Sequence, residues 1–241
     1  MTKLSVNINK IATLRNARGG AKPSVLQAAI DVQRFGAEGI TIHPRPDERH
    51  ITYKDTYDIS EVITTEFNIE GNPQKGRFLE IVKELKPTQA TLVPDSDDVL
   101  TSCAGWDTIK NKSYLTDLIG ELKELGIRVS VFLDPIEQFV DGAKEVGADR
   151  IELYTEAYAT NFNKHKEKAI LPYKKCAEYA QKLGLGINAG HDLDLDNLNY
   201  LKEQIPFMDE VSIGHALICD SLYLGLENTI QMYKRKLSLE R

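Results

Sequence analysis

The stretch FGAEGITIH, residues 35–43, combines a helix end, a tight joint and a buried strand. Its first glycine, Gly36, suits the left-handed position that closes a helix, and the Ile-Thr-Ile run that follows is typical of a strand. The same joint recurs as LGIRV, VGADRI and LGLGI, with Gly126, Gly147 and Gly184 at the equivalent position. A helix–glycine–strand joint that repeats in this way predicts βαβ units and a parallel sheet.

The remaining elements extend the same alternation over the whole chain. Short runs rich in Val and Ile predict strands at residues 4–8, 39–43, 66–70, 90–94, 128–134, 150–154, 186–190 and 210–214. Apolar residues at helical spacing predict helices at residues 24–35, 76–85, 114–125, 136–146, 173–183, 196–204 and 222–237, and a short one at 58–65. The alternation predicts an α/β fold, a (β/α)8 TIM barrel that forms one catalytic domain over residues 1–241.

A doubly wound open sheet would alternate strands and helices in the same way. The sequence has no GxGxxG motif that opens a helix after the first strand, and no GxxxxGK[ST] phosphate-binding motif. It also has no low-complexity linker or break in composition that would divide it into two domains. These features favour the closed barrel.

Composition narrows the class of protein. With 41% hydrophobic and 27% charged residues the chain has the composition of an ordinary globular protein. Its net charge of −6 does not favour nucleic-acid binding. The three cysteines are widely spaced, which argues against a disulfide framework or a cysteine-rich zinc site. We find no signal-peptide core and no run near the ~18 apolar residues of a membrane span, so we expect no membrane association and a cytoplasmic location.

Histidines gather where a barrel places its active site, at the carboxyl ends of the strands. Four of the five lie at or just beyond predicted strand ends, namely His43, His50, His191 and His215. A single histidine there could be structural. Four that converge on one mouth predict acid–base chemistry, because imidazole gains and loses a proton near neutral pH.

Two glutamates also occupy strand-end runs, where their side chains should point into the barrel. A buried carboxylate is costly unless it is paired or functional. We therefore predict a catalytic role for Glu70, whereas for Glu152 a salt bridge to a basic residue at the mouth remains an open alternative.

Several segments suit phosphate groups. NAGHD (188–192) and SIGHAL (212–217) follow the seventh and eighth strands, where barrels often bind phosphate, although ordinary tight turns would use the same glycines. Arginines after the first two strands predict a second anion site, at positions 15, 18, 45 and 49. The long segment 95–113, which holds the only tryptophan, predicts a lid or a mobile surface loop.

Seven segments resemble the pyridoxine 5′-phosphate synthase family, in order and over nearly the whole chain: NINKIATLRNARG (7–19), GITIHPRPDERHI (39–51), FNIEG (67–71), LVPD and LTSCAG (92–105), IELYTEAYA (151–159), NAGHDL (188–193) and SIGHALI (212–218). The resemblance implies a transferase that condenses 3-amino-2-oxopropyl phosphate with 1-deoxy-D-xylulose 5-phosphate. The products would be pyridoxine 5′-phosphate, phosphate and water. The resemblance further implies that no metal or organic cofactor is needed, and that the chain forms homo-oligomers, an octamer built from dimers.

The resemblance also implies roles for individual residues. His43 would be a proton acceptor, Glu70 a second acid–base residue, His191 a proton donor, and Glu152 would stabilise charged intermediates. The aminoketone phosphate would be held by Asn7, Gly214 and His215. The sugar phosphate would be held by Asn9, Lys10, Arg18, Arg45, His50 and Thr101.

Three positions depart from the family pattern. Asn9-Lys10 stands where an acid and a histidine are expected, Asp192 stands where a glycine is expected, and TSCAG replaces a TTEGG-like stretch. The alternatives are a metal-dependent sugar-phosphate epimerase, an aldolase, or a barrel that binds sugar phosphate without catalysis. A metal set could be read from His43, Glu70, His191 and His215, but the sequence has no HxH or HExxH motif.

Overall fold

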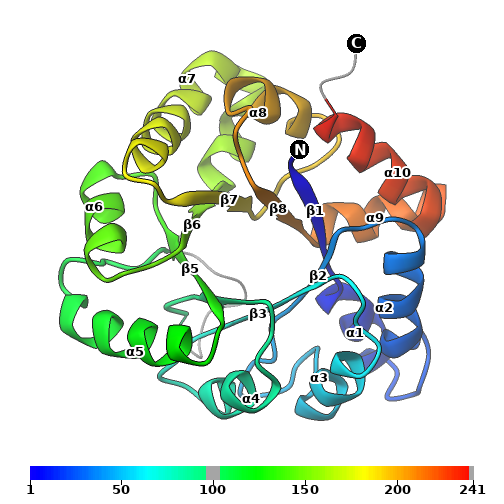
Figure 1. Ribbon diagram of the computed structural model, residues 1–241. Helices are drawn as coiled ribbons and strands as arrows, with labels where there is room; N and C mark the ends of the chain where they lie inside the picture. Colours follow the sequence, from blue (N-terminus) through cyan, green and yellow to red (C-terminus); the bar gives the residue numbers. More distant parts are fainter. Residues whose placement is uncertain (96–103, 239–241) are drawn as a thin grey trace.

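The computed structural model describes residues 1–95 and 104–238. Within these residues eight parallel strands close into a barrel in which each pairs with the next and the last pairs with the first (Figure 1). Closure sets Leu4 opposite Val211. The strands are β1 (Lys3–Asn7), β2 (Gly39–Ile42), β3 (Glu66–Gly71), β4 (Gln89–Leu92), β5 (Arg128–Leu133), β6 (Arg150–Tyr154), β7 (Gly186–Gly190) and β8 (Glu210–Ile213).

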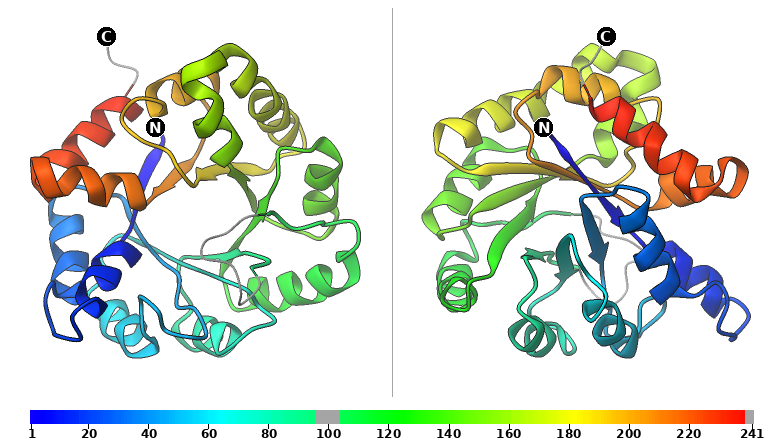
Figure 2. Two further views of the ribbon diagram at one scale, coloured as in Figure 1. Left: turned by 180° about the vertical axis from the view of Figure 1, so that it is seen from behind. Right: turned by 45° about the vertical axis from the view of Figure 1, so that its right-hand side comes forward.

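Helices form a ring around this barrel and cover the outer faces of the strands (Figures 1 and 2). They are α1 (Asn9–Asn16), α2 (Val25–Arg34), α3 (Tyr53–Ser60), α4 (Phe78–Leu85), α5 (Lys112–Glu124), α6 (Glu137–Glu145), α7 (Glu156–Lys182), α8 (Leu198–Gln204), α9 (His215–Leu224) and α10 (Leu226–Leu237). Their apolar faces and the strands share one buried hydrophobic core. The predicted (β/α)8 barrel is confirmed. No helix in the two described ranges is long and apolar enough to cross a bilayer.

The glycine joints have the conformation that the sequence predicts. Gly36, Gly126, Gly147 and Gly184 have φ values of 95°, 80°, 83° and 73°. Each follows a helix and turns the chain toward the next strand, a conformation in which a side chain would be strained. The repeated motif therefore fixes the helix-to-strand direction at four places around the ring.

Two of the predicted helices differ from the structure. The short helix expected at 58–65 begins earlier, as α3 (Tyr53–Ser60), because Thr52 and Asp55 cap its start reciprocally. The helix expected at 222–237 is divided into α9 and α10 at Gly225, where φ is 78°.

Two further helical segments lie outside the predicted ranges. α1 begins at Asn9, directly after β1, so Asn9 and Lys10 lie in a helical turn rather than at a strand end. α7 starts at Glu156, well before the predicted residue 173, and its helical geometry is interrupted at His165, where φ is −153°. The polar composition of this first half of α7 concealed it from a search for apolar periodicity.

Polar side chains fill the amino-terminal half of the barrel interior, and several of them pair with one another. The Ser5 and Thr41 hydroxyls lie 2.7 Å apart, and the Thr91 hydroxyl donates to the Asn68 side chain at 3.0 Å. Glu210 is buried here, but Nη1 of Arg150 lies 3.2 Å from its carboxylate. A buried carboxylate in this half of the barrel is thus balanced by a guanidinium.

Candidate active site

A cavity of about 530 Å³ opens at the carboxyl ends of the strands. Eleven of the residues predicted from the sequence line it: Asn7, Asn9, Lys10, His43, Arg45, His50, Glu70, Glu152, His191, Gly214 and His215. The same wall contains Val93, Phe132, Tyr154, Glu156, Asp192 and Ser212. Side chains from all eight strands or their following loops thus meet in one space, as the barrel topology requires.

Two predicted residues are not among those lining the cavity. Thr101 lies outside the described residues. Arg18 is exposed, beyond the end of α1. Since α1 starts at the cavity wall with Asn9 and runs outward for eight residues, its far end is about 12 Å away along the helix axis. The fold of one chain therefore does not bring Arg18 to its own cavity.

His43 and Glu70 face one another across the mouth. The backbone N–H of His43 donates to Oδ1 of Asn9 at 3.0 Å, which fixes the start of the loop after β2. Nδ1 of His43 lies 3.9 Å from Oε2 of Glu70. Glu70 also accepts long hydrogen bonds, each of 3.4 Å, from the Asn7 amide and the Ser212 hydroxyl.

Burial shifts both groups away from their charged forms. The pKa of His43 is held well below its ordinary value, first by burial and then by the positive charge of Arg45. The pKa of Glu70 is raised to about 8, first by burial and then by the negative charge of Asp95. At neutral pH the arrangement is a neutral imidazole beside a carboxylic acid, so His43 can accept a proton and Glu70 can give one.

Glu152 projects into the barrel from β6 and is almost completely buried. Its Oε2 has no hydrogen-bond partner among the residues that the structure describes. Its pKa is raised well above the ordinary value by burial and by the nearby carboxyls of Glu70 and Glu210. Within residues 1–95 and 104–238 the salt bridge considered as an alternative for Glu152 is not formed, in contrast to Glu210 below it. An orphaned buried carboxyl aimed into a cavity indicates a functional group.

The close packing behind Glu152 depends on a glycine. A Cβ at Gly190 would lie 2.5 Å from Oε1 of Glu152 and 3.1 Å from the Ser212 carbonyl. Gly190 is the last residue of β7, so the strand end can pass the carboxyl only without a side chain.

The loop after β8 forms one anion-binding corner. α9 begins at His215 with Gly214 as its N-cap, so the helix N-terminus, with its partial positive charge, opens on the cavity. A Cβ at Gly214 would lie 3.1 Å from Asn7, which explains the glycine there. The loop after β7 differs, because α8 starts only at Leu198 and no helix N-terminus follows the NAGHD segment directly.

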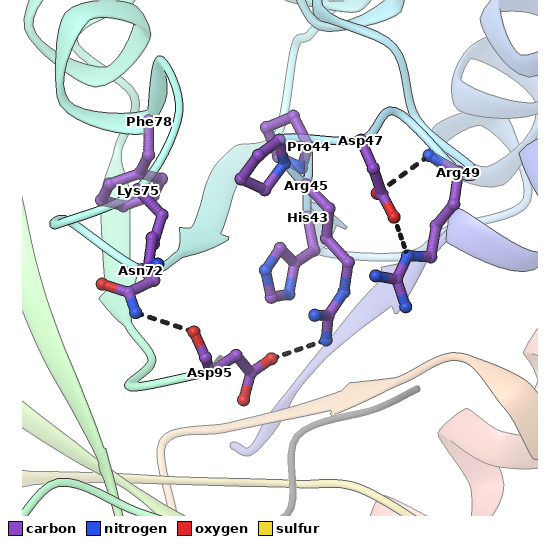
Figure 3. Close-up of a pocket in the computed structure, with 10 residues that line it drawn as sticks. His43, Pro44, Arg45, Asp47, Arg49, Asn72, Lys75, Phe78 and Asp95 are labelled. Atoms are coloured by element: carbon purple, nitrogen blue, oxygen red, sulfur yellow. Dashed lines mark hydrogen bonds and ion pairs between the residues drawn. The ribbon is translucent and has the colours of Figure 1, made fainter. Parts of the chain in front are cut away.

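Cationic and polar side chains continue the cavity wall from this corner, where Lys10 follows β1 and Arg45 and His50 follow β2, the next strands around the barrel from β8. Figure 3 shows Arg45 and Asn72 reaching toward Asp95 from two different loops. Arg45 Nη2 lies 2.6 Å from Oδ2 of Asp95, and the Asn72 amide donates to the Asp95 carbonyl at 2.7 Å. The loops after β2, β3 and β4 are thereby tied together beside the cavity.

Arg15 and Arg49 of the predicted cluster have structural partners. Arg15 forms a two-point ion pair with Asp55, which links α1 to α3. Nε of Arg49 lies 2.7 Å from Asp47, two residues away. The cluster thus divides into Arg45, which faces the cavity, and Arg15, which holds two helices together.

Part of the cavity wall is aromatic, a feature that the sequence analysis does not predict. The rings of Phe132 and Tyr154 lie 5.2 Å apart, and Tyr154 meets His191 edge to face at 5.1 Å. Tyr154 is two residues beyond Glu152 on β6, so strand alternation places both on the same face. That periodicity was the signal that could have found it.

The residues considered as metal ligands are not grouped closely enough to bind an ion. Within residues 1–95 and 104–238 no three His, Cys, Asp or Glu side chains are grouped to hold an ion. The four residues considered for such a set, His43, Glu70, His191 and His215, come from different loops around the cavity.

Solved structures support the fold alone. The chain aligns with a phosphoribosylanthranilate isomerase from Thermotoga maritima at a TM-score of 0.59 and 13% identity, covering 98% of each chain. It aligns with a structure of the Amycolatopsis orientalis BexX/CysO complex at a TM-score of 0.64 and 14% identity, covering 98% of this chain and 90% of that one. Identities this low carry no argument about activity.

Relatives found by sequence share a much higher identity with the chain than these solved structures do. The chain is 66% identical to a pyridoxine 5′-phosphate synthase from Cytophaga hutchinsonii over 237 residues, which cover 98% of this chain and 99% of the relative. Synthases of the same name from Christiangramia forsetii and Porphyromonas gingivalis are 60% and 57% identical, over 98% and 99% of this chain and all of each relative. Residues 4–239 match the model of the pyridoxal phosphate biosynthesis protein PdxJ. The chain therefore belongs to the PdxJ family of pyridoxal phosphate biosynthesis proteins.

Proposed function

We propose that this chain is a pyridoxine 5′-phosphate synthase. It condenses 3-amino-2-oxopropyl phosphate with 1-deoxy-D-xylulose 5-phosphate and releases pyridoxine 5′-phosphate, phosphate and water. The observation that carries the proposal is the buried pair of His43 and Glu70, with Glu152 behind it, inside a cavity that has two anion-binding corners. Membership of a family whose relatives carry this name supports the same activity.

The two corners bind the two phosphates. The N-terminus of α9, with Gly214, His215 and Asn7, holds the aminoketone phosphate. Lys10, Arg45, His50 and Asn9, which follow the neighbouring strands β1 and β2, hold the sugar phosphate. Two fixed phosphates set the amine of one substrate against the ketone of the other, which removes much of the entropic cost of their reaction.

The acid–base side chains of the cavity transfer protons during ring formation. Ring formation requires amine addition to a ketone, loss of water, loss of phosphate, closure of a carbon–carbon bond and aromatisation. His43 accepts a proton, Glu70 acts as a second acid–base residue, His191 donates a proton, and Glu152 stabilises charged intermediates. A closed cavity with several such groups is what a sequence of proton transfers requires.

We also propose that the chain acts as a homo-oligomer in the cytoplasm. In support, Leu222, Tyr223 and Leu224 form an apolar patch at the end of α9, and Tyr223 is 90% exposed. Such a patch is typical of an interaction surface. Light scattering of the purified protein would give its mass, and a mass of 27.1 kDa would refute oligomer formation.

The test of the activity is product formation by chelator-treated protein given both substrates, with phosphate release followed in parallel. Pyridoxine 5′-phosphate that appears with an equal amount of phosphate, and only when both substrates are present, would support the proposal. The matched control is His43→Ala. Absence of product from the unmodified protein would overturn the proposal, and the saturable binding of one substrate alone would then indicate a non-catalytic barrel.

A further inference from the structure

The loop after β7 contains two successive non-glycine residues in the left-handed region of backbone space. His191 has a φ of 87° and Asp192 a φ of 58°. This conformation is unfavourable for residues with side chains, and it persists only where surrounding contacts impose it. Residues held in this way concentrate at functional sites.

Contacts on both sides impose this conformation. The buried Thr155 hydroxyl lies 2.7 Å from the carbonyl of Gly190 and 2.6 Å from that of His191. On the other side the amide of Asn197, itself buried, donates to the Asp192 carbonyl at 3.1 Å. The peptide units around His191 and Asp192 are therefore clamped between the end of β6 and the start of α8.

The result of this geometry is an imidazole–carboxylate pair. Nδ1 of His191 lies 2.9 Å from Oδ2 of Asp192, although adjacent residues in a strand would project to opposite sides. The edge of the same imidazole packs against the Tyr154 ring, which limits its rotation. The hydrogen bond from His191 holds the pKa of Asp192 below its ordinary value, so the carboxylate is charged at neutral pH.

We propose that Asp192 is a positioning residue, whose carboxylate holds the His191 ring in the orientation and tautomer that carry the proton on Nδ1. Proton exchange with substrate then takes place at Nε2, and the carboxylate stabilises the ring when it is protonated. The proposal rests on the proposed function, in which His191 transfers protons. It also explains how a carboxylate fits beside a phosphate site, since its charge is directed to the imidazole.

Kinetics of Asp192→Asn and Asp192→Gly test the proposal, because asparagine and glycine both accept a positive φ. Asparagine keeps an acceptor without the charge, whereas glycine removes both. We expect kcat to fall in the order Asp, Asn, Gly, by about 10- to 100-fold for glycine, with both KM values changed less than about threefold. The loss should be smaller than for a fully buried orienting carboxylate, because the Asp192 side chain is 42% exposed.

Asp196→Asn is the matched control, because Asp196 lies exposed in the same segment and does not line the cavity. It should keep normal kcat. A kcat within twofold of normal in Asp192→Gly would overturn the proposal. So would a raised KM at unchanged kcat, which would assign Asp192 to substrate binding.

The second readout does not depend on turnover. Solid-state ¹⁵N spectra of histidine-labelled protein, with His191→Gln to assign the signal, report which ring nitrogen carries the proton. We expect protonated Nδ1 in the unmodified protein and a shift toward protonated Nε2 in Asp192→Gly. An unchanged spectrum would overturn the positioning role even if the activity is confirmed. Absence of product from the unmodified protein would instead refute the proposed function and leave the tautomer result standing.

Discussion

Nδ1 of His43 lies 3.9 Å from Oε2 of Glu70, and both side chains are largely withdrawn from solvent. Burial moves their pKa values in opposite directions, so that the pair is neutral at neutral pH. A base and an acid side by side can transfer protons in both directions without placing a net charge in the cavity. This property suits a reaction with several successive proton transfers.

The first prediction concerns the acid of this pair. Glu70→Gln keeps the shape of the neutral carboxyl and one of its two acceptor oxygens, but it has no proton to exchange. We expect turnover to fall by about 10²- to 10⁴-fold with little change in KM. Glu124→Gln, an exposed position on α5, is the control in the same steady-state assay. Near-normal turnover in Glu70→Gln would remove Glu70 from the catalytic set.

The same carboxyl makes stability depend on pH. The folded pKa of Glu70, about 8, lies above its ordinary value of 4.5, so the folded state retains a proton that the unfolded chain releases between these values. The contribution of Glu70 to stability is therefore present below about pH 4.5 and is lost as the pH rises toward 8. Relative to Glu70→Gln, the unmodified protein should lose a few kcal/mol over this range, since one pKa unit corresponds to about 1.4 kcal/mol.

Urea unfolding of both proteins at several pH values between 5 and 8.5 measures this difference. As the pH rises, the free energy of unfolding of Glu70→Gln should increase steadily relative to that of the unmodified protein, although the variant has low turnover. A stability difference that stays constant with pH would show that Glu70 ionises as readily in the folded as in the unfolded chain.

A third prediction concerns the ion pair between Arg45 and Asp95, whose side chains are 6% and 3% exposed. Asp95→Asn leaves the guanidinium without its counter-charge, and we expect a loss of about 3 kcal/mol in the free energy of unfolding. The negative charge of Asp95 raises the pKa of Glu70, whereas Arg45 lowers it. Removal of the carboxylate should therefore shift the alkaline limb of the kcat/KM profile to lower pH.

The direction of that shift distinguishes an electrostatic effect from a general loss of folding. A partly unfolded variant would lower kcat/KM at every pH without moving the limb. Asp47→Asn, which removes the more exposed ion-pair partner of Arg49 in the loop after β2, should leave the limb in place.

The barrel and most of its mouth follow from local patterns. A left-handed residue closes many helices before the next strand, so repeated glycine joints such as those at Gly36 and Gly147 indicate the fold directly. The residues at strand ends must then meet, whatever their order in the chain. This is why His43, Glu70 and His191 could be placed in one cavity from the sequence.

Pairings between distant segments have no such local signal. Arg15 was predicted to bind phosphate, but Asp55 of α3 binds it. Asp192 was noted only as a departure from an expected glycine, and its contact with the His191 ring depends on a left-handed backbone that Thr155 and Asn197 impose. Such backbone conformations in non-glycine residues arise from tertiary contacts and carry no sequence pattern.

The last prediction uses the glycine behind Glu152. A methyl group at Gly190 would lie 2.5 Å from Oε1 of Glu152, closer than any real contact, so Gly190→Ala must push the buried carboxyl out of place. We expect a drop in kcat of at least about tenfold together with a loss of about 1–3 kcal/mol in the free energy of unfolding, because overpacking strains the barrel. Gly120→Ala on α5 is the matched control: nothing lies within 4 Å of its added Cβ, and alanine should stabilise the helix by up to about 1 kcal/mol. Turnover assays and urea unfolding of both variants separate the effect on kcat from the effect on the free energy of unfolding. If Gly190→Ala is destabilised but turns over normally, the position of Glu152 does not matter to the reaction.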